Sequence, residues 1–222
     1  MKFHIVTLFK EAFDSYLHES IMARALAKGF IGVSFYNPRD FTKDKFRRVD
    51  DRPYGGGPGM VLQVEPLLNA VSSIVRGKKK TKVLIFSPAG RQFTNAYARE
   101  LAEKYNHLVL VAGRYEGIDA RLKKILKADL SAKALASVEE ISIGPYILSG
   151  GELPALVVVE TVARQVPGVL GKAESIEESR VSSPEVYTRP EIFNHKGKKY
   201  RVPKVLLSGN HADIEKWKKN RS

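Results

Sequence analysis

Short apolar runs alternate with longer helix-like stretches along the first 165 residues of the chain. The apolar runs have the length of buried strands, and most are followed by a stretch with the composition of a helix. This order is typical of a parallel sheet with helices packed against it, so the sequence predicts an α/β fold with a mostly parallel sheet and flanking helices. We expect strands at 3–8, 30–35, 83–86, 107–111 and 141–143, and helices at 11–28, 65–76, 94–104, 123–139 and 152–165.

One loop between a strand and a helix is unusually rich in glycine. The segment 140–155 reads EISIGPYILSGGELPA, in which a short apolar run breaks into Gly144-Pro145 and then Gly150-Gly151 before the helix. Glycine lets a backbone bend sharply or lets a ligand approach closely. Since open α/β sheets bind ligands beyond the carboxyl ends of their strands, this loop is a candidate small-molecule site. The alternative is a turn that only reverses the chain.

Two further predicted strands end in similar loops, SPAGR at 87–91 and GRYEGID at 113–119. If all three strands are parallel, the three loops lie at the same edge of the sheet and converge on one pocket. Glu116, taken alone, is better explained as a surface carboxylate. No G-x-G-x-x-G motif follows the first strand, so a dinucleotide cradle is excluded there.

The segment 37–60 is polar and basic and then glycine-rich, with no periodicity. Loops of this length inside a domain are usually functional or disordered. Its arginines and Tyr54, beside Gly55, Gly56 and Gly57, have the chemistry to hold phosphates. No Lys-Ser/Thr pair follows the glycines, so this segment is not a P-loop.

The chain is strongly basic, with 37 Lys and Arg against 24 Asp and Glu and a formal charge of +13. Such an excess favours a polyanionic partner. The last 35 residues alone carry ten Lys or Arg against three acids, interleaved with aromatic residues such as Phe193, Tyr200 and Trp217. This pattern suits nucleic-acid binding, although a solvated basic tail remains the alternative.

Other compositional features narrow the class of protein. No apolar run approaches the roughly 20 residues that a membrane helix needs, and the amino terminus lacks the pattern of a secretory signal. We therefore expect a cytoplasmic protein with no membrane partner. Zero cysteines exclude disulfides, a thiol nucleophile and a thiolate metal site.

Seven blocks, in order, together resemble the bacterial tRNA (guanine-N1)-methyltransferase family, TrmD. The resemblance implies an enzyme of the knotted (trefoil) SPOUT class that uses S-adenosyl-L-methionine to methylate N1 of the guanosine immediately 3′ of the anticodon in tRNA. It also implies a homodimer whose active site is shared between subunits. The blocks are VDDRPYGGGPGM at 49–60, SPAGR at 87–91, GRYEGID at 113–119, SIGPYILSGGELPA at 142–155, PGVLG at 167–171, YTRPE at 187–191 and VLLSGNHADIEKW at 205–217.

The same resemblance implies a domain organisation. Residues 1–166 would form the SPOUT-like catalytic domain, 167–186 a flexible linker, and 187–222 a small, mainly helical basic module that binds tRNA. Three features depart from the family pattern: Pro145 replaces a common Asp, the 123–139 segment is longer, and the carboxyl-terminal module is shorter.

The resemblance also implies roles for individual residues. It assigns Arg164 to the guanine and Glu178 to the catalytic base, with Glu177 as the alternative because Glu178 requires a one-residue gap. It implies no metal ligand, and Mg²⁺ dependence stays open. The methyl donor is placed among Ser87, Pro88, Gly113, Tyr115, Glu116, Ile143, Gly144, Tyr146, Ile147, Leu148, Gly150 and Gly151.

Two other functions compete with this one. A non-enzymatic RNA-binding protein would account for the basic charge without a donor pocket. The strand-end loops argue against it, because a simple binder has no need of them. Among enzymes, the runner-up is a methyltransferase of the same fold that acts on another nucleoside or on a ribose.

Overall fold

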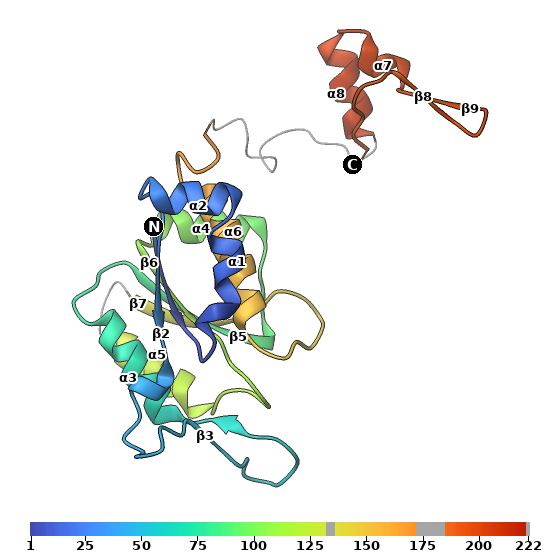
Figure 1. Cartoon of the computed structure of the whole chain (residues 1–222). Coiled ribbons are helices and arrows are strands. Elements are labelled where there is room, and N and C mark those ends of the chain that lie inside the picture. Colours follow the sequence, from blue (N-terminus) through green and yellow to red (C-terminus); the bar gives the residue numbers. More distant parts are fainter. Residues whose placement is uncertain (132–135, 172–184, 221–222) are drawn as a thin grey trace. The chain divides into compact units, whose positions relative to one another are not determined.

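The structure is a computed structural model that describes residues 1–131, 136–171 and 185–220. The chain divides into two compact units, residues 1–171 and 172–222 (Figure 1). The division falls inside the stretch predicted as a linker. Each unit is described by itself below.

The first unit is built on a five-stranded sheet in which every pairing is parallel, with the order β2-β1-β6-β5-β7. The predicted α/β fold with a mostly parallel sheet is therefore confirmed. The strands are β1 (Lys2–Val6), β2 (Gly32–Tyr36), β5 (Thr81–Gln92), β6 (His107–Val111) and β7 (Ala136–Ser142).

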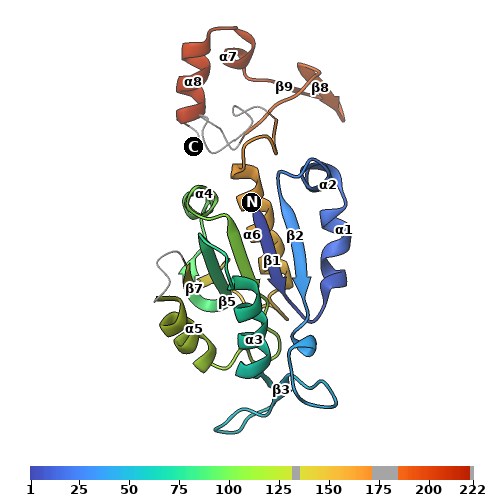
Figure 2. The ribbon, with the colours of Figure 1, turned by 90° about the vertical axis from the view of Figure 1, so that its left-hand side faces the viewer.

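Helices cover both faces of this sheet, as Figure 2 shows. Alternate residues of β6 point to opposite faces, so Leu108 and Leu110 pack into one buried cluster and Val109 and Val111 into the other. A strand buried on both faces reads as a continuous apolar run, which is why the sequence predicted β6 well. One cluster includes α1 (Asp14–Leu17), α2 (Ser20–Ala27), α4 (Asn95–Lys104) and α6 (Glu152–Gln165), and the other includes α3 (Val64–Val75) and α5 (Arg121–Ser131).

The predicted single helix over 11–28 is wrong. The segment forms a 3₁₀ turn (η1, Lys10–Phe13) and then the separate helices α1 and α2. Between the two helices the His18 Nδ1 bonds to the Asp14 carbonyl at 2.8 Å, and Ser20 takes a φ of 49°. A left-handed residue cannot continue an α-helix, so the chain turns there.

The predicted helix over 123–139 is wrong in its second half. α5 ends at Ser131, and by Ala136 the chain has already begun β7, which pairs with β5. The composition of this segment favours a helix, but pairing with a neighbouring strand overrides that weak preference.

Strand β5 is longer than predicted because the chain pairs with β7 twice. Thr81 to Phe86 pair with β7, the register then shifts, and Arg91 and Gln92 pair with it again. A Cβ added to Gly90 would lie 2.5 Å from the Ile141 backbone nitrogen. The 87–91 segment is thus pressed against β7.

A short ribbon extends from the segment that the sequence left without periodicity. It contains a 3₁₀ turn (η2, Pro38–Asp40) and the two strands β3 (Asp50–Asp51) and β4 (Val61–Leu62). At the tip, Tyr54 is fully exposed and Gly55, Gly56 and Gly57 all have positive φ. The tip glycines adopt backbone conformations that other residues rarely take.

The second unit combines a hairpin with two helices. The sequence resemblance implied a mainly helical module here, and the hairpin was not predicted. Its turn, Lys196-Gly197, has positive φ at both residues, as a type I′ turn requires, and Lys-Gly is a weaker signal for that turn than Asn-Gly. The elements are β8 (Ile192–His195), β9 (Lys198–Arg201), α7 (Lys204–Leu207) and α8 (His211–Lys219).

No helix in the described parts of the chain is both long and apolar enough to cross a membrane.

Candidate active site

A cavity lies at the carboxyl edge of the sheet, where β5, β6 and β7 lead into their loops. All twelve residues that the sequence assigned to the methyl donor line this cavity. They come from 87–88, from 113–116 and from 143–151, so the three predicted segments do converge, although 87–91 is an irregular part of strand β5 and not a loop as predicted. Glu116 is the one carboxylate among the described residues that line it.

The loop that follows β7 is held by its own hydrogen bonds. The Ser142 hydroxyl donates to the Gly144 carbonyl at 2.9 Å and accepts from the Gly144 N–H at 3.2 Å, while the Tyr146 hydroxyl donates to the Ile143 carbonyl at 3.2 Å. The Tyr146 ring folds so closely onto Gly144 that a Cβ there would collide with it. These contacts give the cavity wall a defined shape before any ligand binds.

The buried carboxylate of Glu152 connects two of the loops that line the cavity. Glu152, the first residue of α6, is only 4% exposed. Its Oε1 accepts a hydrogen bond from the Thr7 hydroxyl at 2.9 Å, and its Oε2 lies 3.0 Å from Arg114 Nε. The Arg114 guanidinium in turn lies 4.4 Å from the centre of the Phe9 ring.

The hydrogen bond from Thr7 and the ion pair with Arg114 offset part of the cost of burying the charge of Glu152. The ion pair joins Arg114, on the loop after β6, to Glu152, at the end of the loop after β7. Thr7, Phe9 and Glu152 were not predicted from the sequence as contributors to the site. The one feature of the sequence that could have indicated this role of Glu152 is its position as a single carboxylate at the start of an apolar helix, next to two glycines.

The glycines of the loop make room for protein atoms. A Cβ on Gly150 would lie 2.5 Å from both Arg114 Nε and Glu152 Oε2, and one on Gly151 would lie 2.6 Å from the Ala112 Cα. The Gly151 N–H also donates to the Gly113 carbonyl at 2.8 Å. Gly150 and Gly151 therefore pack the 113–117 and 148–152 segments together, a role that the sequence alone did not indicate.

The 87–91 segment is anchored by Glu139 on β7. This carboxylate accepts a hydrogen bond from the Tyr97 hydroxyl at 2.5 Å and forms ion pairs with Lys82 at 2.8 Å and Arg91 at 3.5 Å. Burial alone would raise the Glu139 pKa, but the hydrogen bonds from Lys82 and Tyr97 outweigh it and lower the pKa. A charged Glu139 thus fixes the return of the chain at Arg91, just after Ser87 and Pro88.

The ribbon at 37–62 contacts the loop that follows β6. The Glu116 N–H donates to the Met60 carbonyl, and the Leu62 N–H donates to the Gly117 carbonyl, both at 3.0 Å. Tyr115 has a φ of 61°, which is unusual for a residue other than glycine and is found most often at functional sites. Burial, and then a hydrogen bond to Asp50, raise the pKa of the Tyr115 hydroxyl.

Arg164 does not lie in the cavity of its own chain. It is in the last turn of α6, whereas the cavity is at the start of that helix. At 1.5 Å per residue, the distance from Glu152 to Arg164 along the helix is about 18 Å, more than an arginine side chain can reach. The predicted base, Glu178, and its alternative, Glu177, lie outside the described residues.

Within the described ranges, no group of three or more His, Asp or Glu side chains is placed to hold a metal ion.

The fold and the cavity define an α/β protein with a cavity at the carboxyl edge of a parallel sheet, which is where proteins of this class bind ligands. The model of one protein family, described as tRNA (Guanine-1)-methyltransferase TrmD, matches residues 1–222. The chain belongs to this family, as the sequence resemblance indicated.

Curated relatives agree over nearly the whole chain. The tRNA (guanine-N(1)-)-methyltransferase of Pseudoalteromonas atlantica is 46% identical over 225 residues, which cover 99% of this chain and 79% of the relative. The proteins of the same name from Carboxydothermus hydrogenoformans and Pseudomonas aeruginosa are 45% and 46% identical. Those matches cover 100% and 96% of this chain, and 83% and 81% of the relatives.

Proposed function

We propose that this protein transfers a methyl group from S-adenosyl-L-methionine to N1 of the guanosine immediately 3′ of the anticodon in tRNA. One observation carries the proposal. In a chain that matches the family over its full length, three separate segments bring all twelve predicted donor-binding residues to one cavity. A tRNA substrate would place the protein in the cytoplasm.

The cavity suits a ligand with both an adenosyl and an amino-acid part. Tyr146, Ile147 and Leu148 offer partly exposed apolar surface along one wall. Gly113, Gly150 and Gly151 bring the backbone to the cavity wall, and backbone groups there that are not engaged in the Gly151–Gly113 hydrogen bond can fix the polar edge of such a ligand. When bound, the donor would supply a methyl group on a positively charged sulfur.

The chemistry at guanine requires a base and a cation. N1 of guanine carries a proton at neutral pH, so the proton must leave as the methyl group arrives, and negative charge then grows on O6. Glu178 is the proposed base, and Arg164 would stabilise the charge on O6 without losing its own proton.

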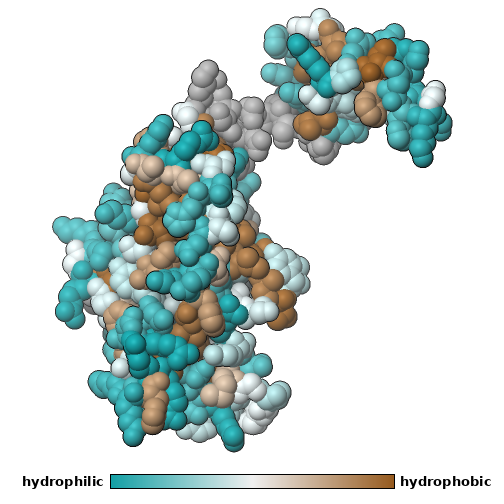
Figure 3. All heavy atoms as spheres, in the orientation of Figure 1, coloured by the Kyte–Doolittle hydropathy of each residue, from teal (hydrophilic) through white to brown (hydrophobic). Residues whose placement is uncertain are grey.

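We further propose that the active site is shared between two subunits of a homodimer. Arg164 is too far along α6 to reach its own cavity, so Arg164 of a second copy would have to supply the guanidinium. Leu153 and Val157, one turn apart on α6, are 61% and 42% exposed, and Ile147 is 82% exposed. Figure 3 shows hydrophobic side chains gathered over the loop between β7 and α6, and a second subunit would cover this apolar surface.

Membership of the family suggests two further proposals, one about the topology of the first unit and one about the role of the second. We propose the knotted SPOUT topology, which the double pairing of β5 with β7 and the close packing of Gly90 support. We also propose that 187–222 is a basic module that binds tRNA and takes no part in the chemistry, with 167–186 as the linker.

The test is to incubate the protein with methyl-labelled S-adenosyl-L-methionine and unmodified tRNA, with and without Mg²⁺, and to identify the product nucleoside. We expect N1-methylguanosine at the position 3′ of the anticodon. A label on a ribose or on another base would favour the runner-up methyltransferase. Tight tRNA binding with no label transferred would favour a non-enzymatic RNA-binding protein.

A further inference from the structure

The hairpin of the second unit has two chemically different faces. Phe193 is opposite Tyr200, and His195 is opposite Lys198, in the antiparallel register of β8 and β9. Because alternate residues of a strand point to opposite sides, these four side chains share one face, which we call the aromatic face. The opposite face carries Ile192, Asn194, Lys199 and Arg201.

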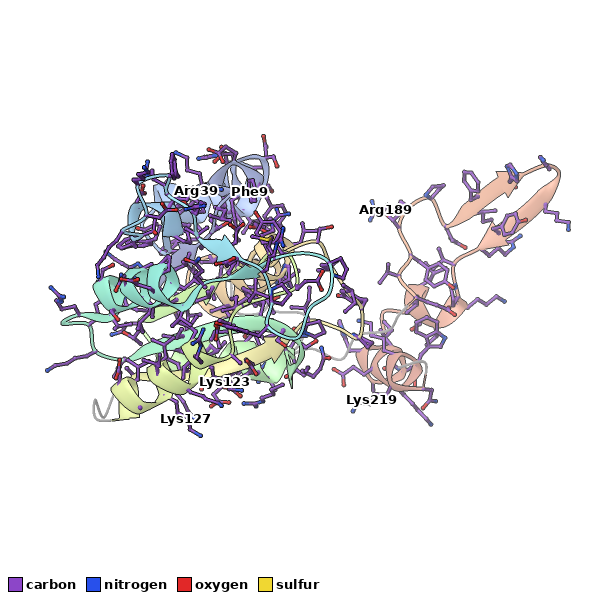
Figure 4. All side chains as sticks on the ribbon, turned by 90° about the horizontal axis from the view of Figure 1, so that it is seen from below. Phe9, Arg39, Lys123, Lys127, Arg189 and Lys219 are labelled. Carbon is purple, nitrogen blue, oxygen red and sulfur yellow. The ribbon has the colours of Figure 1, made fainter. Side chains whose placement is uncertain are left out.

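The aromatic face is open to solvent. Phe193 is 60% exposed and Tyr200 is 55% exposed. The rings of Phe193 and His195 lie nearly parallel, at 13°, with their centres 6.5 Å apart. The hairpin also extends away from α7 and α8 of its own unit, as Figures 1 and 4 show, so these two helices do not cover the face.

The charge around this face indicates the kind of partner that covers it. Between Ile192 and Arg201 there are four cationic residues, Lys196, Lys198, Lys199 and Arg201, and no acid. A protein core would accept the rings but would not favour Lys198 on the same face, with three more cations on the turn and the opposite face of so short a hairpin. Exposed aromatic rings among cations are the combination that binds unpaired bases, because the rings stack on the bases and the cations meet the phosphates.

We infer that the aromatic face of the β8–β9 hairpin stacks on an unpaired nucleobase of the tRNA, while Lys198 contacts a neighbouring phosphate. This inference rests on the proposed function and specifies how the second unit would grip its substrate. Phe193 and Tyr200 would be the residues in contact with the base.

The experiment compares full-length variants in tRNA binding, with binding of S-adenosyl-L-methionine as the control. The double variant Phe193→Leu/Tyr200→Leu keeps apolar bulk but removes the rings. We expect it to lose about tenfold or more in tRNA affinity, as removal of a base–aromatic stack does. Phe193→Trp, which keeps a ring, should stay within about threefold of wild type.

Two lysine variants provide a matched comparison, since Lys198 and Lys199 are adjacent but lie on opposite faces. Lys198→Ala should weaken tRNA binding and make its salt dependence shallower by about one phosphate contact. Lys199→Ala should have a smaller effect on both the tRNA affinity and its salt dependence.

Three results would count against the inference. Wild-type affinity in the double leucine variant would overturn it, and so would equal effects of Phe193→Leu and Phe193→Trp. A change in sedimentation with unchanged tRNA affinity would show that the face packs on protein, either a second copy or the first unit. Failure of the wild-type chain to bind tRNA at all would instead remove the proposed function.

Discussion

The two units of this protein differ in how far their side chains are buried. The first unit surrounds its sheet with two buried clusters, in which side chains such as Leu84 and Val109 have no exposed surface. In the second unit, none of the described residues from 185 to 220 is buried. Side chains labelled in Figure 4, such as Arg189 and Lys219 of the second unit, are solvent-facing.

This difference indicates different roles for the two units, because the first can hold a cavity in a fixed geometry and the second is suited to binding a partner. A unit with a full core can hold loops in a fixed geometry, as a binding cavity requires. A unit as small as residues 172–222, in which none of the described residues is buried, is marginal alone and gains stability from what it binds. Changes in the first unit should therefore alter stability and chemistry, whereas changes in the second should alter affinity for a polyanion.

The largest expected effect concerns Glu178, the proposed catalytic base, which lies in sequence between the residues that line the cavity and those of the proposed basic module. Glu178→Gln should slow methyl transfer by about 10²–10⁴-fold, because the N1 proton would lose its acceptor. Glu177→Gln is the matched control and should be mild, and calorimetry should show donor affinity little changed in both. The reverse order would make Glu177 the base, and full activity in both would direct attention to Glu116 in the cavity.

A smaller effect is expected at the buried anchor of the cavity. Glu152→Ala would leave Arg114 without its partner and should lower the free energy of unfolding by about 3 kcal/mol. Glu191→Ala, at an exposed carboxylate of the second unit, should change it by less than about 0.5 kcal/mol. Urea unfolding measures both, and equal values would contradict the contrast between the units.

Acid should weaken the first unit through a buried histidine. Burial, and then the positive charges of His107, Lys78 and Lys2, lower the His4 pKa to about 4. The unfolded pKa is about 6.5, so the folded state favours neutral His4, and this stability is present above about pH 6.5 and lost as pH falls towards 4.

The expected loss between pH 7.5 and pH 4 is about 2–3 kcal/mol in unfolding free energy. His4→Gln should flatten that part of the pH profile, whereas His211→Gln, in the second unit, should leave it unchanged. A wild-type profile that His4→Gln does not alter would remove this role of His4.

The smallest effect is expected from single charges on the second unit. Replacing Lys216 or Lys218 by Gln should lower tRNA affinity only slightly, and at most one phosphate contact should be lost from the salt dependence. Neither change should move the unfolding midpoint of the first unit. A loss of methyl transfer at saturating tRNA would show that the second unit takes part in the chemistry.

The sequence predicted the elements whose pattern is set by burial. β6 was predicted over its full length because apolar side chains cover both of its faces, and the three cavity loops followed from glycine and proline at the ends of parallel strands. What it missed depends on partners distant in the chain. The first part of β7, residues 136–139, was predicted as helix and forms a strand by pairing with β5, and Glu152 acts as an anchor because Thr7 and Arg114 reach it.

The hairpin shows a second limit of predicting structure from the sequence. Lys196-Gly197 turns the chain, and the two four-residue strands, IFNH and KKYR, show no clear alternation of apolar and polar residues. Such a hairpin is specified mainly by its turn, whose dipeptide is a weak signal.

The division of roles between the units can be measured directly by titrating S-adenosyl-L-methionine and tRNA into the full chain and into a protein truncated after residue 186. The account predicts that the truncated protein binds the donor as tightly as the full chain and binds tRNA far more weakly, with a shallower salt dependence. Unchanged tRNA affinity in a truncated protein that still binds the donor would contradict it.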